Sequence, residues 1–585
     1  MNWKHLDSAR RDAGAIEVDL IEAYAQGKIN RRNFVKRGAV IGLSVPFMGG
    51  IIAACGGSDD AGDGNVPDTG GGDDAAPTSE GSSGGGGQGG TILAGIQTGD
   101  ANSGLDPLNM LDLGTYSVLS QSFEYLVGLA EDGSGGIGPT ALASDWSPND
   151  DGSVWTFTLR EGIMWQDDTP FTSADVVATL DRMAVKAAGV GGVLSEGGAV
   201  ADGDLSVVVT LDAPNGNFPA LVSIYNPQSL ITPSDYTDGT TLDERSTGTG
   251  AWILDNFDAG AFTATFTPNP NWWGGTVNLD SITLQGFDSG GTQVAAMASG
   301  EIDMIQQFSV SDGANLLEAD GFTLLKPPSS NHRQIWFNTQ LPEGGPFTDP
   351  RVRQAVCFAV NRQQIIDSIY EGQARVANDH PVFMDWEYFD ESQEQRPHDP
   401  EMARQLLADA GHEGLSGSIR VGDLQEVPAV AAIVAQNLAE AGFQLDVQSV
   451  PNSDFYGIGD GQGWCPADTE DPTTPCGNSA QIGIVDYGHR PTPDIFFGRA
   501  LSTGGDWNSS NYASDEFDSL FSDFQSSVDV DGQKDACGKI QRLLHEDSPA
   551  CYAYFFDYLS GHSSNIEGVE VTALGHMQFQ KATKS

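Results

Sequence analysis

The stretch 418–450 reads SIRVGDLQEVPAVAAIVAQNLAEAGFQLDVQSV and decides the class of fold. Its first four residues, 418–421, predict a strand, and 428–441 predicts a helix that Gly442 closes. Residues 443–450 alternate between apolar and polar side chains, which is typical of a second strand. A strand, a helix and a strand in this order predict a partly parallel sheet with helices packed on it. The chain is therefore expected to have an α/β fold.

Helices with clear start and stop signals lie on both sides of this unit. Asp349 and Pro350 begin a helix that is expected to run towards Gly372, and 399–411 carries the same signals for another. An acidic N-cap, a proline in the first turn and a glycine after the last turn favour these positions. The first half of the chain is instead rich in alternating runs that predict strands, at 91–97, 154–159, 205–211 and 262–266.

Composition excludes one large class of function. The formal net charge is −53, from 28 Lys and Arg against 81 Asp and Glu, and nucleic-acid binding needs clustered cations that this chain lacks. The carboxylates are spread along the whole sequence, which favours general solvation, although attraction of cationic ligands stays an alternative. Roughly 490 residues behind the N-terminal segment are enough for one large domain or two to three ordinary ones.

The N-terminal segment predicts export and lipid anchoring. Arg31 and Arg32, followed by Phe-Val-Lys, resemble a twin-arginine export signal, and 52–55 resembles the lipobox of bacterial lipoproteins, with Cys55 as the lipidated residue. The apolar span between them is short and interrupted by glycines and a proline, so a permanent membrane helix is the weaker alternative. We therefore expect a signal peptide at 1–54.

Residues 55–90 follow this signal and predict a disordered tether. Gly, Ser, Asp, Pro and Ala make up almost all of them, and they cannot bury enough apolar surface to offset the entropy lost on ordering. The protein is expected at the extracytoplasmic or periplasmic face of the cell membrane, held there only by its lipid anchor.

Cysteine usage fits an oxidising compartment. Cys465 with Cys476, and Cys537 with Cys551, are candidate disulfides, which leaves Cys357 as an odd, buried thiol in an apolar helical pattern. Neither a CxxC motif nor Cys/His spacing for a metal is present, so no metal or cofactor is expected.

Many short motifs recur in an order that resembles a known family, over residues 91 to 575. They are Ala143-Ser-Asp-Trp146, Asp151-Gly-Ser-Val-Trp-Thr-Phe-Thr-Leu-Arg160, Thr169-Pro-Phe-Thr-Ser-Ala-Asp-Val176, Gly248-Thr-Gly250, Asn269-Pro-Asn-Trp-Trp-Gly-Gly275, Ser299-Gly-Glu-Ile-Asp303, Asp349-Pro-Arg-Val-Arg-Gln-Ala355, 403–411 and Phe517-Asp518. The sequence resembles the bacterial extracellular solute-binding proteins of family 5, which serve ABC importers of peptides, nickel and related solutes.

This resemblance implies a fold and a mode of action. It implies the type II periplasmic-binding-protein fold, with two lobes that close on a ligand and hinge crossings near 326–336 and 552–558. The lobes are expected at these ranges: lobe I at 91–327 with an inserted subdomain at about 116–235, lobe II at 328–553, and a return to lobe I at 554–585. It further implies a monomer that captures a peptide or other polar small solute for the permease subunits of an ABC importer, and that is not an enzyme.

Ligand residues are expected mainly in the loop 486–494. In peptide-binding members of the family an aspartate in this loop pairs with the amino terminus of the peptide, and His489 stands at that position here. Arg490 is either a clamp for a carboxylate or phosphate or the partner of one of the many surface acids. The candidate ligand residues are Tyr116, Trp336, Tyr487, His489, Arg490, Asp494, Trp507 and Asn508.

Two other functions stay open on sequence alone. A secreted hydrolase is disfavoured because the chain lacks both a Gly-x-Ser-x-Gly elbow and a His-Glu-x-x-His pair. A receptor that passes its ligand signal to another protein would have the same capture machinery as a transport protein.

Overall fold

The computed structural model describes residues 89–585, apart from 100–103, 111, 132–135, 187–188, 238–240, 244–246, 341–344, 452–454, 456–481 and 506. The predicted signal peptide with Arg31, Arg32 and Cys55, nearly all of the predicted tether, and Cys465 and Cys476 lie outside the described residues. Among the helices that are described, none is long and apolar enough to cross a membrane.

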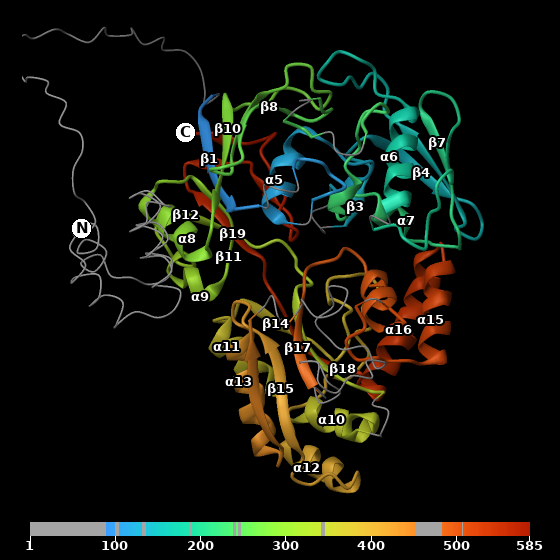
Figure 1. Ribbon diagram of the computed structural model, residues 1–585, viewed down its shortest axis with the longest axis vertical. Coiled ribbons are helices and arrows are strands. Elements are labelled where there is room, and N and C mark those ends of the chain that lie inside the picture. Colours follow the sequence, from blue (N-terminus) through green and yellow to red (C-terminus); the bar gives the residue numbers. More distant parts are fainter. Residues whose placement is uncertain are drawn as a thin grey trace, which may run out of the picture. The chain divides into compact units, whose positions relative to one another are not determined.

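Lobe I is built on a seven-stranded mixed sheet (Figure 1). In spatial order the strands are β12 (Phe322–Leu325), β19 (Leu559–Ser563), β11 (Met304–Phe308), β1 (Thr91–Gln97), β10 (Ser281–Phe287), β9 (Thr263–Pro268) and β8 (Trp252–Asp258). The central strand β1 pairs in parallel with β10 and β11. Helices α5 (Leu113–Ser122) and α8 (Gly290–Ser299) pack against this sheet.

The inserted subdomain has a sheet of its own in the order β4 (Ala143–Pro148), β5 (Val154–Leu159), β7 (Ser206–Thr210) and β6 (Ala199–Ala201). Helix α6 (Ser173–Lys186) packs against β6 and β7. Trp155 and Phe157 of β5 are buried in a core continuous with that of lobe I. The predicted strand 154–159 is therefore confirmed and forms the centre of this subdomain.

Lobe II contains the β-α-β unit that the sequence predicts. Its six-stranded sheet has the order β14 (Ala374–Val376), β18 (Ala550–Phe556), β13 (His332–Phe337), β17 (Ile482–Tyr487), β15 (Ser416–Gly422) and β16 (Gln444–Val450). Strands β15 and β16 are parallel and are joined by α13 (Val427–Glu440). The prediction of a partly parallel sheet is confirmed.

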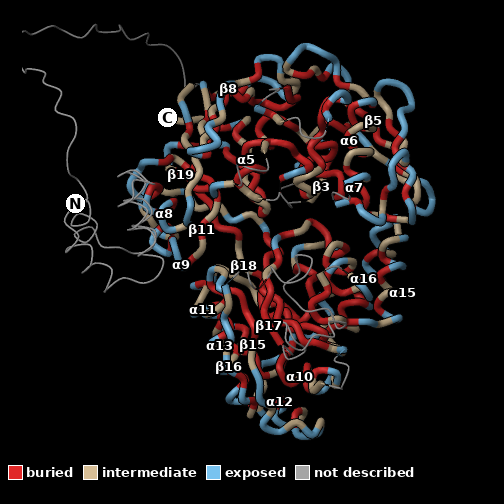
Figure 2. The backbone as a smooth tube through the Cα atoms, in the orientation of Figure 1, coloured by how far each residue is buried: buried red, intermediate tan, exposed pale blue. Residues whose placement is uncertain are grey.

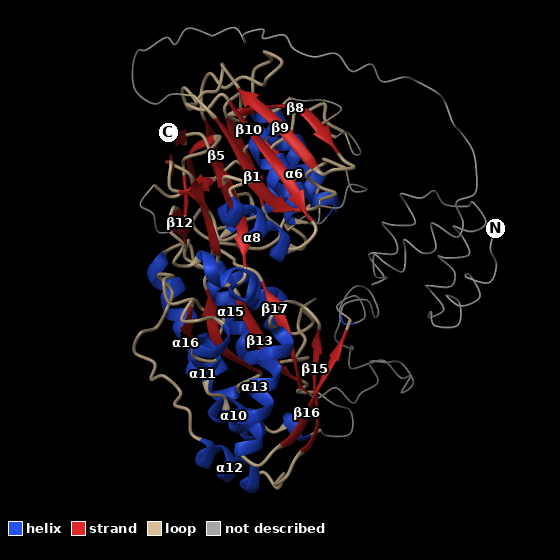
Figure 3. Ribbon diagram, turned by 90° about the vertical axis from the view of Figure 1, so that its left-hand side faces the viewer, coloured by secondary structure: helices blue, strands red, loops and turns tan. Residues whose placement is uncertain are grey.

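Helices cover one face of this sheet (Figure 3). They are α10 (Pro350–Ala359), α11 (Arg362–Ile369), α12 (Pro400–Asp409) and α13. The strands β17 and β18 are buried over most of their length, whereas the outer sides of the helices are exposed (Figure 2). A separate aromatic cluster joins α15 (Asp515–Ser526) to α16 (Val530–Asp547).

Shorter elements complete the described chain. They are β2 (Gly128–Leu129), β3 (Ile137–Gly138), α7 (Phe218–Leu221), η1 (Pro227–Ser229), α9 (Val310–Gly313), η2 (Ala314–Leu316), η3 (Pro346–Thr348), the π-helix η4 (Phe496–Leu501), β20 (Ile566–Glu567), β21 (Glu570–Val571), β22 (Met577–Gln578) and β23 (Thr583–Lys584).

The described chain passes between the two large sheets at two places. The first crossing is 326–331, between β12 and β13, and the second is 557–558, between β18 and β19. The first lies within the predicted hinge region. The second is shorter than predicted, and the predicted start of the return to lobe I at 554 is too early, because β18 stays in the lobe II sheet as far as Phe556.

One predicted helix is divided in two. The expected helix from Pro350 towards Gly372 ends at Ala359, and α11 begins at Arg362. Val360 is extended, and the side chain of Asn361 accepts a hydrogen bond from the Gln364 amide. An asparagine that caps a new helix in this way ends the preceding one, so the sequence contained a stop signal that the apolar periodicity concealed.

The predicted disulfide between Cys537 and Cys551 is wrong. Both are free and buried, and they belong to different apolar clusters. Helix α16 continues for ten residues beyond Cys537, from 537 to Asp547, which carries the chain about 15 Å away before β18 begins. Disulfides need Cα atoms within about 7 Å. Cys551 instead faces Cys357, which is buried as predicted.

Candidate ligand site

The loop after β17 is held by the first crossing segment. The Asn331 side-chain oxygen accepts a hydrogen bond from the His489 amide at 2.6 Å, and the Ser330 hydroxyl accepts one from the Arg490 amide at 3.0 Å. Both contacts join residues that are far apart in sequence. The hinge segment therefore fixes the position of the loop in which the sequence predicted ligand residues.

The hydrogen bonds of His489 determine which of its two ring nitrogens carries the proton. The Ser330 amide donates to His489 Nδ1 at 3.0 Å, so Nδ1 must be the unprotonated nitrogen. Burial and the nearby Arg490 charge lower the His489 pKa to about 3, which keeps the ring neutral. In a neutral imidazole with this tautomer, Nε2 carries the proton. The ring also meets Tyr225 of lobe I edge to face, with centroids 5.3 Å apart.

Two guanidinium groups share one indole beside this histidine. The Arg499 and Arg490 Cζ atoms lie 3.7 Å and 5.5 Å from the Trp507 ring centroid. Arg490 donates to the His489 carbonyl at 2.7 Å, and among the described residues it forms no ion pair with a carboxylate. Burial and the Arg499 charge lower its pKa to about 10, which still leaves it charged at neutral pH. Arg490 is half-buried, and a cation in such a place without a carboxylate partner among the described residues is unusual in a chain of net charge −53.

Other predicted residues support this region from within. The Tyr487 hydroxyl donates to the Trp507 carbonyl at 2.8 Å. Asp494 is buried beside Thr492, and burial raises its pKa to about 6. The side-chain amide of Asn508 donates hydrogen bonds to the carbonyls of Ser502 and Tyr512. These residues shape the loops, in which Arg490 and Trp507 are half-buried and His489 is buried.

Two predicted residues lie in the interior. The Tyr116 hydroxyl is bonded to His576 Nδ1 inside lobe I. Trp336 is buried in the cluster formed with Tyr487 and Phe496, and its indole nitrogen has no partner among the described atoms. In the described structure, neither Tyr116 nor Trp336 contacts His489.

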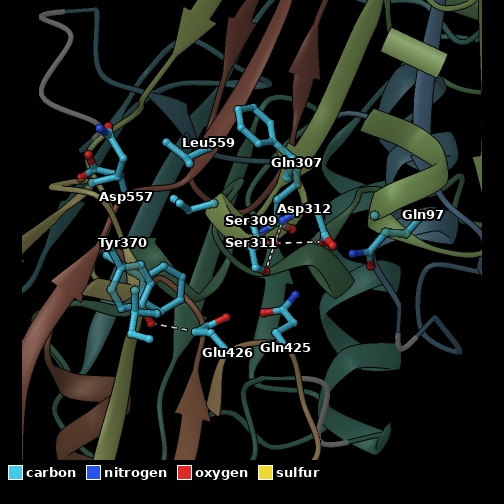
Figure 4. Close-up of a pocket in the computed structure, with 16 residues that line it drawn as sticks. Gln97, Gln307, Ser309, Ser311, Asp312, Tyr370, Gln425, Glu426, Asp557 and Leu559 are labelled. Atoms are coloured by element: carbon cyan, nitrogen blue, oxygen red, sulfur yellow. Dashed lines mark hydrogen bonds between the residues drawn. The ribbon is translucent and has the colours of Figure 1, made fainter. Parts of the chain in front are cut away.

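A cavity of about 150 Å³ is lined by residues of both lobes (Figure 4). Side chains alternate along a strand, so His332 packs beside Tyr487 while Arg333 points to the opposite face, where it meets Gln425 and Glu426 of the cavity wall. Lobe I contributes α9 and the ends of β1 and β11. No sequence signal indicated this cavity.

Two of the three carboxylates that line this cavity, Glu426 and Asp557, are paired with cations. Glu426 accepts hydrogen bonds from Arg333 and from the Tyr370 hydroxyl, both at 2.8 Å. Asp557 pairs with Lys326 at 3.6 Å, and Asp312 accepts from Ser309. The volume is below the 300 Å³ or so of ordinary ligand pockets. The cavity therefore offers room for ordered water at the hinge, whereas Arg490 is a cation without a carboxylate partner among the described residues.

A buried histidine beside the site makes stability depend on pH. Burial, Arg333 and Arg490 lower the His332 pKa to about 4, and its ordinary value is 6.5. Its share of stability is therefore complete above about pH 6.5 and is lost as the pH falls, because only the unfolded state binds the proton. Acidification from about pH 7.5 to about pH 5 should cost the wild type about 2 kcal/mol more than His332→Gln. Urea unfolding of both proteins at both pH values checks this, and equal losses would contradict it.

Some residues of the site were missed by the sequence. Tyr225 comes from the inserted subdomain, and Ser330 and Asn331 come from the crossing segment. A lone tyrosine and a Ser-Asn pair carry no periodicity or motif that would single them out. These three residues become part of the site only because the fold brings the inserted subdomain, the first crossing segment and the loop after β17 together.

The fold and the site define a class of protein. Two lobes joined by two crossing segments are the features of a receptor that binds its ligand between closing lobes. The profile of the bacterial extracellular solute-binding proteins, family 5 (middle region), matches residues 139–476. The chain belongs to this family, whose members act as substrate receptors of ABC importers.

Known relatives agree with this assignment. Heme-binding protein A of Haemophilus influenzae is 29% identical over 342 residues, which cover 54% of this chain and 61% of that protein. Glutathione-binding protein GsiB of Salmonella paratyphi A is 25% identical over 475 residues, covering 79% of this chain and 89% of that protein. The solved structure of HbpA2 from Haemophilus parasuis has a TM-score of 0.71 at 21% identity and covers 85% of this chain and 100% of that one.

Proposed function

We propose that this protein captures a peptide-like or other small polar solute that carries an acidic group, and presents it to the permease subunits of an ABC importer. The observation that supports an acidic ligand is the pair formed by His489 and Arg490. The Ser330 contact leaves the proton of His489 on Nε2, which can donate it, and the Arg490 guanidinium has no carboxylate partner among the described residues. Donors beside a positive charge favour a carboxylate or another anion.

The same pair disfavours the amino terminus of a peptide as the group bound at this position. The resemblance to peptide-binding members implies an aspartate here, which would attract an ammonium group. His489 offers an N–H donor instead, and the neighbouring guanidinium repels cations. Similarity to a glutathione-binding relative supports this reading, because glutathione carries two carboxylates.

Capture would proceed through lobe closure. Tyr225 of lobe I contacts His489 of lobe II, so a ligand beside His489 can touch both lobes only when they are close. Contacts made only in the closed state shift the equilibrium towards it. We propose that the importer recognises this closed state, that the protein works as a monomer without enzymatic activity, and that Arg31, Arg32 and Cys55 direct its export and lipid anchoring.

Closure also brings the inserted subdomain against lobe II at a second place. The Gly216 amide donates to the Gln525 carbonyl at 2.7 Å, and a Cβ at position 216 would lie 2.1 Å from the Ser527 carbonyl oxygen. Gly216→Ala should therefore weaken ligand binding by about tenfold or more, because the closed state is less populated. Calorimetric titration measures this. Gly291→Ala is the control, since a Cβ there meets no atom within 4 Å, and equal affinities for both variants would contradict the prediction.

The proposed ligand class is tested with matched pairs of compounds. Glutathione and a set of short peptides are each offered with free and with amidated carboxyl groups, and the melting temperature of the purified protein is measured. In every pair that binds, the free acid should raise the melting temperature more than the amide, because only the acid can pair with Arg490. Equal shifts, or a preference for the amides, would reject the acidic ligand.

A further inference from the structure

Two buried cysteines from distant parts of the sequence meet in the core of lobe II. Cys357 lies in α10 and Cys551 in β18, and neither has any exposed surface. Their sulfur atoms lie within 4.8 Å of each other, and α10 packs directly against β18. Both are free thiols in this structure.

A metal ion does not explain this pair. The third group within the same distance is Asp379, but its two oxygens accept hydrogen bonds from Arg362 at 2.6 Å and Arg396 at 2.5 Å. The two guanidinium groups neutralise Asp379 and would repel a cation. Among the described residues, only two thiols remain as donors, and a structural zinc needs four ligands.

We propose that Cys357 and Cys551 form a disulfide when the protein folds in an oxidising environment. A thiolate of one residue attacks a sulfur of a small-molecule disulfide, RSSR, and releases RS⁻. The thiolate of the other then attacks the mixed disulfide and releases a second RS⁻. The protons of the two cysteines pass to the two RS⁻ groups, so two thiols are oxidised and one RSSR is reduced to two RSH.

The bond has a defined place in the fold. It ties the helical layer of lobe II to β18, the strand that leads directly into the second crossing at 557–558. Lobe II would then move as one rigid body when the lobes close. The remaining described cysteine, Cys537, lies in the α15 and α16 cluster and would be the one unpaired thiol among the described cysteines. The bond does not depend on which ligand the protein binds.

Burial explains why the bond should form during folding. A hydrogen bond with Cys357, together with burial, raises the pKa of the Cys551 thiol well above its ordinary value. Little thiolate is therefore present in the folded protein, and the core excludes an oxidant. Exchange is fast only while the chain is partly open, so protein folded under reducing conditions should stay reduced afterwards.

The test is refolding of the full chain in a mixture of oxidised and reduced glutathione, followed by alkylation and peptide mapping without reduction. The expected result is a peptide that links Cys357 to Cys551, lighter by two hydrogen atoms than the two free peptides. A reductant should lower the melting temperature of the refolded Cys465→Ala/Cys476→Ala/Cys537→Ala variant by roughly 5–10 °C. It should have no effect when Cys551→Ala is added. Both cysteines alkylated, or either one linked to another cysteine, would overturn the proposal.

Discussion

Replacing Asp379 by alanine should destabilise the protein by about 3–5 kcal/mol. Asp379 has no exposed surface, and its carboxylate pairs with Arg362 and Arg396, which are themselves buried. Although burial opposes it, these two guanidinium groups hold the Asp379 pKa below its ordinary value. Its loss leaves two positive charges in the core of lobe II without a partner. Urea unfolding at neutral pH measures the effect.

The matched control is an exposed pair of the same chemical type. Asp385 pairs with Arg375 at 2.8 Å, but about two-fifths of each side chain is exposed. Asp385→Ala should cost less than about 1 kcal/mol, because water screens the charges and replaces the contact. If the two alanine variants were equally stable, the network around Asp379 would not hold lobe II together as argued.

Replacing Arg490 by alanine should weaken the binding of an acidic ligand by roughly 1–3 kcal/mol, or about 5- to 150-fold. The guanidinium lies against Trp507 and donates to the main-chain carbonyl of His489, so it is held in place before the ligand arrives. Calorimetric titration of the wild type and the variant with the tightest acid from the matched pairs gives the difference.

Two further variants separate charge from geometry at this site. Arg490→Lys keeps the charge but loses the planar fork, so it should recover only part of the affinity. Arg375→Ala removes a positive charge from the exposed ion pair with Asp385, which makes no contact with His489 or Arg490 in the described structure, and should leave binding unchanged. Unchanged affinity in Arg490→Ala would exclude a role for Arg490 in holding an anion.

Local patterns in the sequence predicted regular elements well. The strand predicted at 91–97 is β1, Thr91–Gln97, and the helix predicted at 428–441 is α13, Val427–Glu440. Each depends on periodicity and end signals that lie within a few residues of each other. The family resemblance then supplied the order of the lobes, which no single element could.

Contacts between distant segments could not be predicted in this way. Cys537 and Cys551 were candidate disulfide partners in an oxidising compartment, yet they lie in different apolar clusters, and Cys551 lies beside Cys357. Similarly, the ligand role of the loop 486–494 stays a prediction, and the tautomer of His489 within it depends on Ser330 in the crossing segment. Such details depend on how the sheets are assembled.

The central claim is that the lobes close on a solute whose acidic group is held by His489 and Arg490. The most direct measurement is native mass spectrometry of the protein purified gently from the cell that produces it, followed by denaturation to release and identify the retained molecule. The account predicts a small molecule with a free carboxylate or another anionic group. A retained molecule that is neutral or cationic would contradict it.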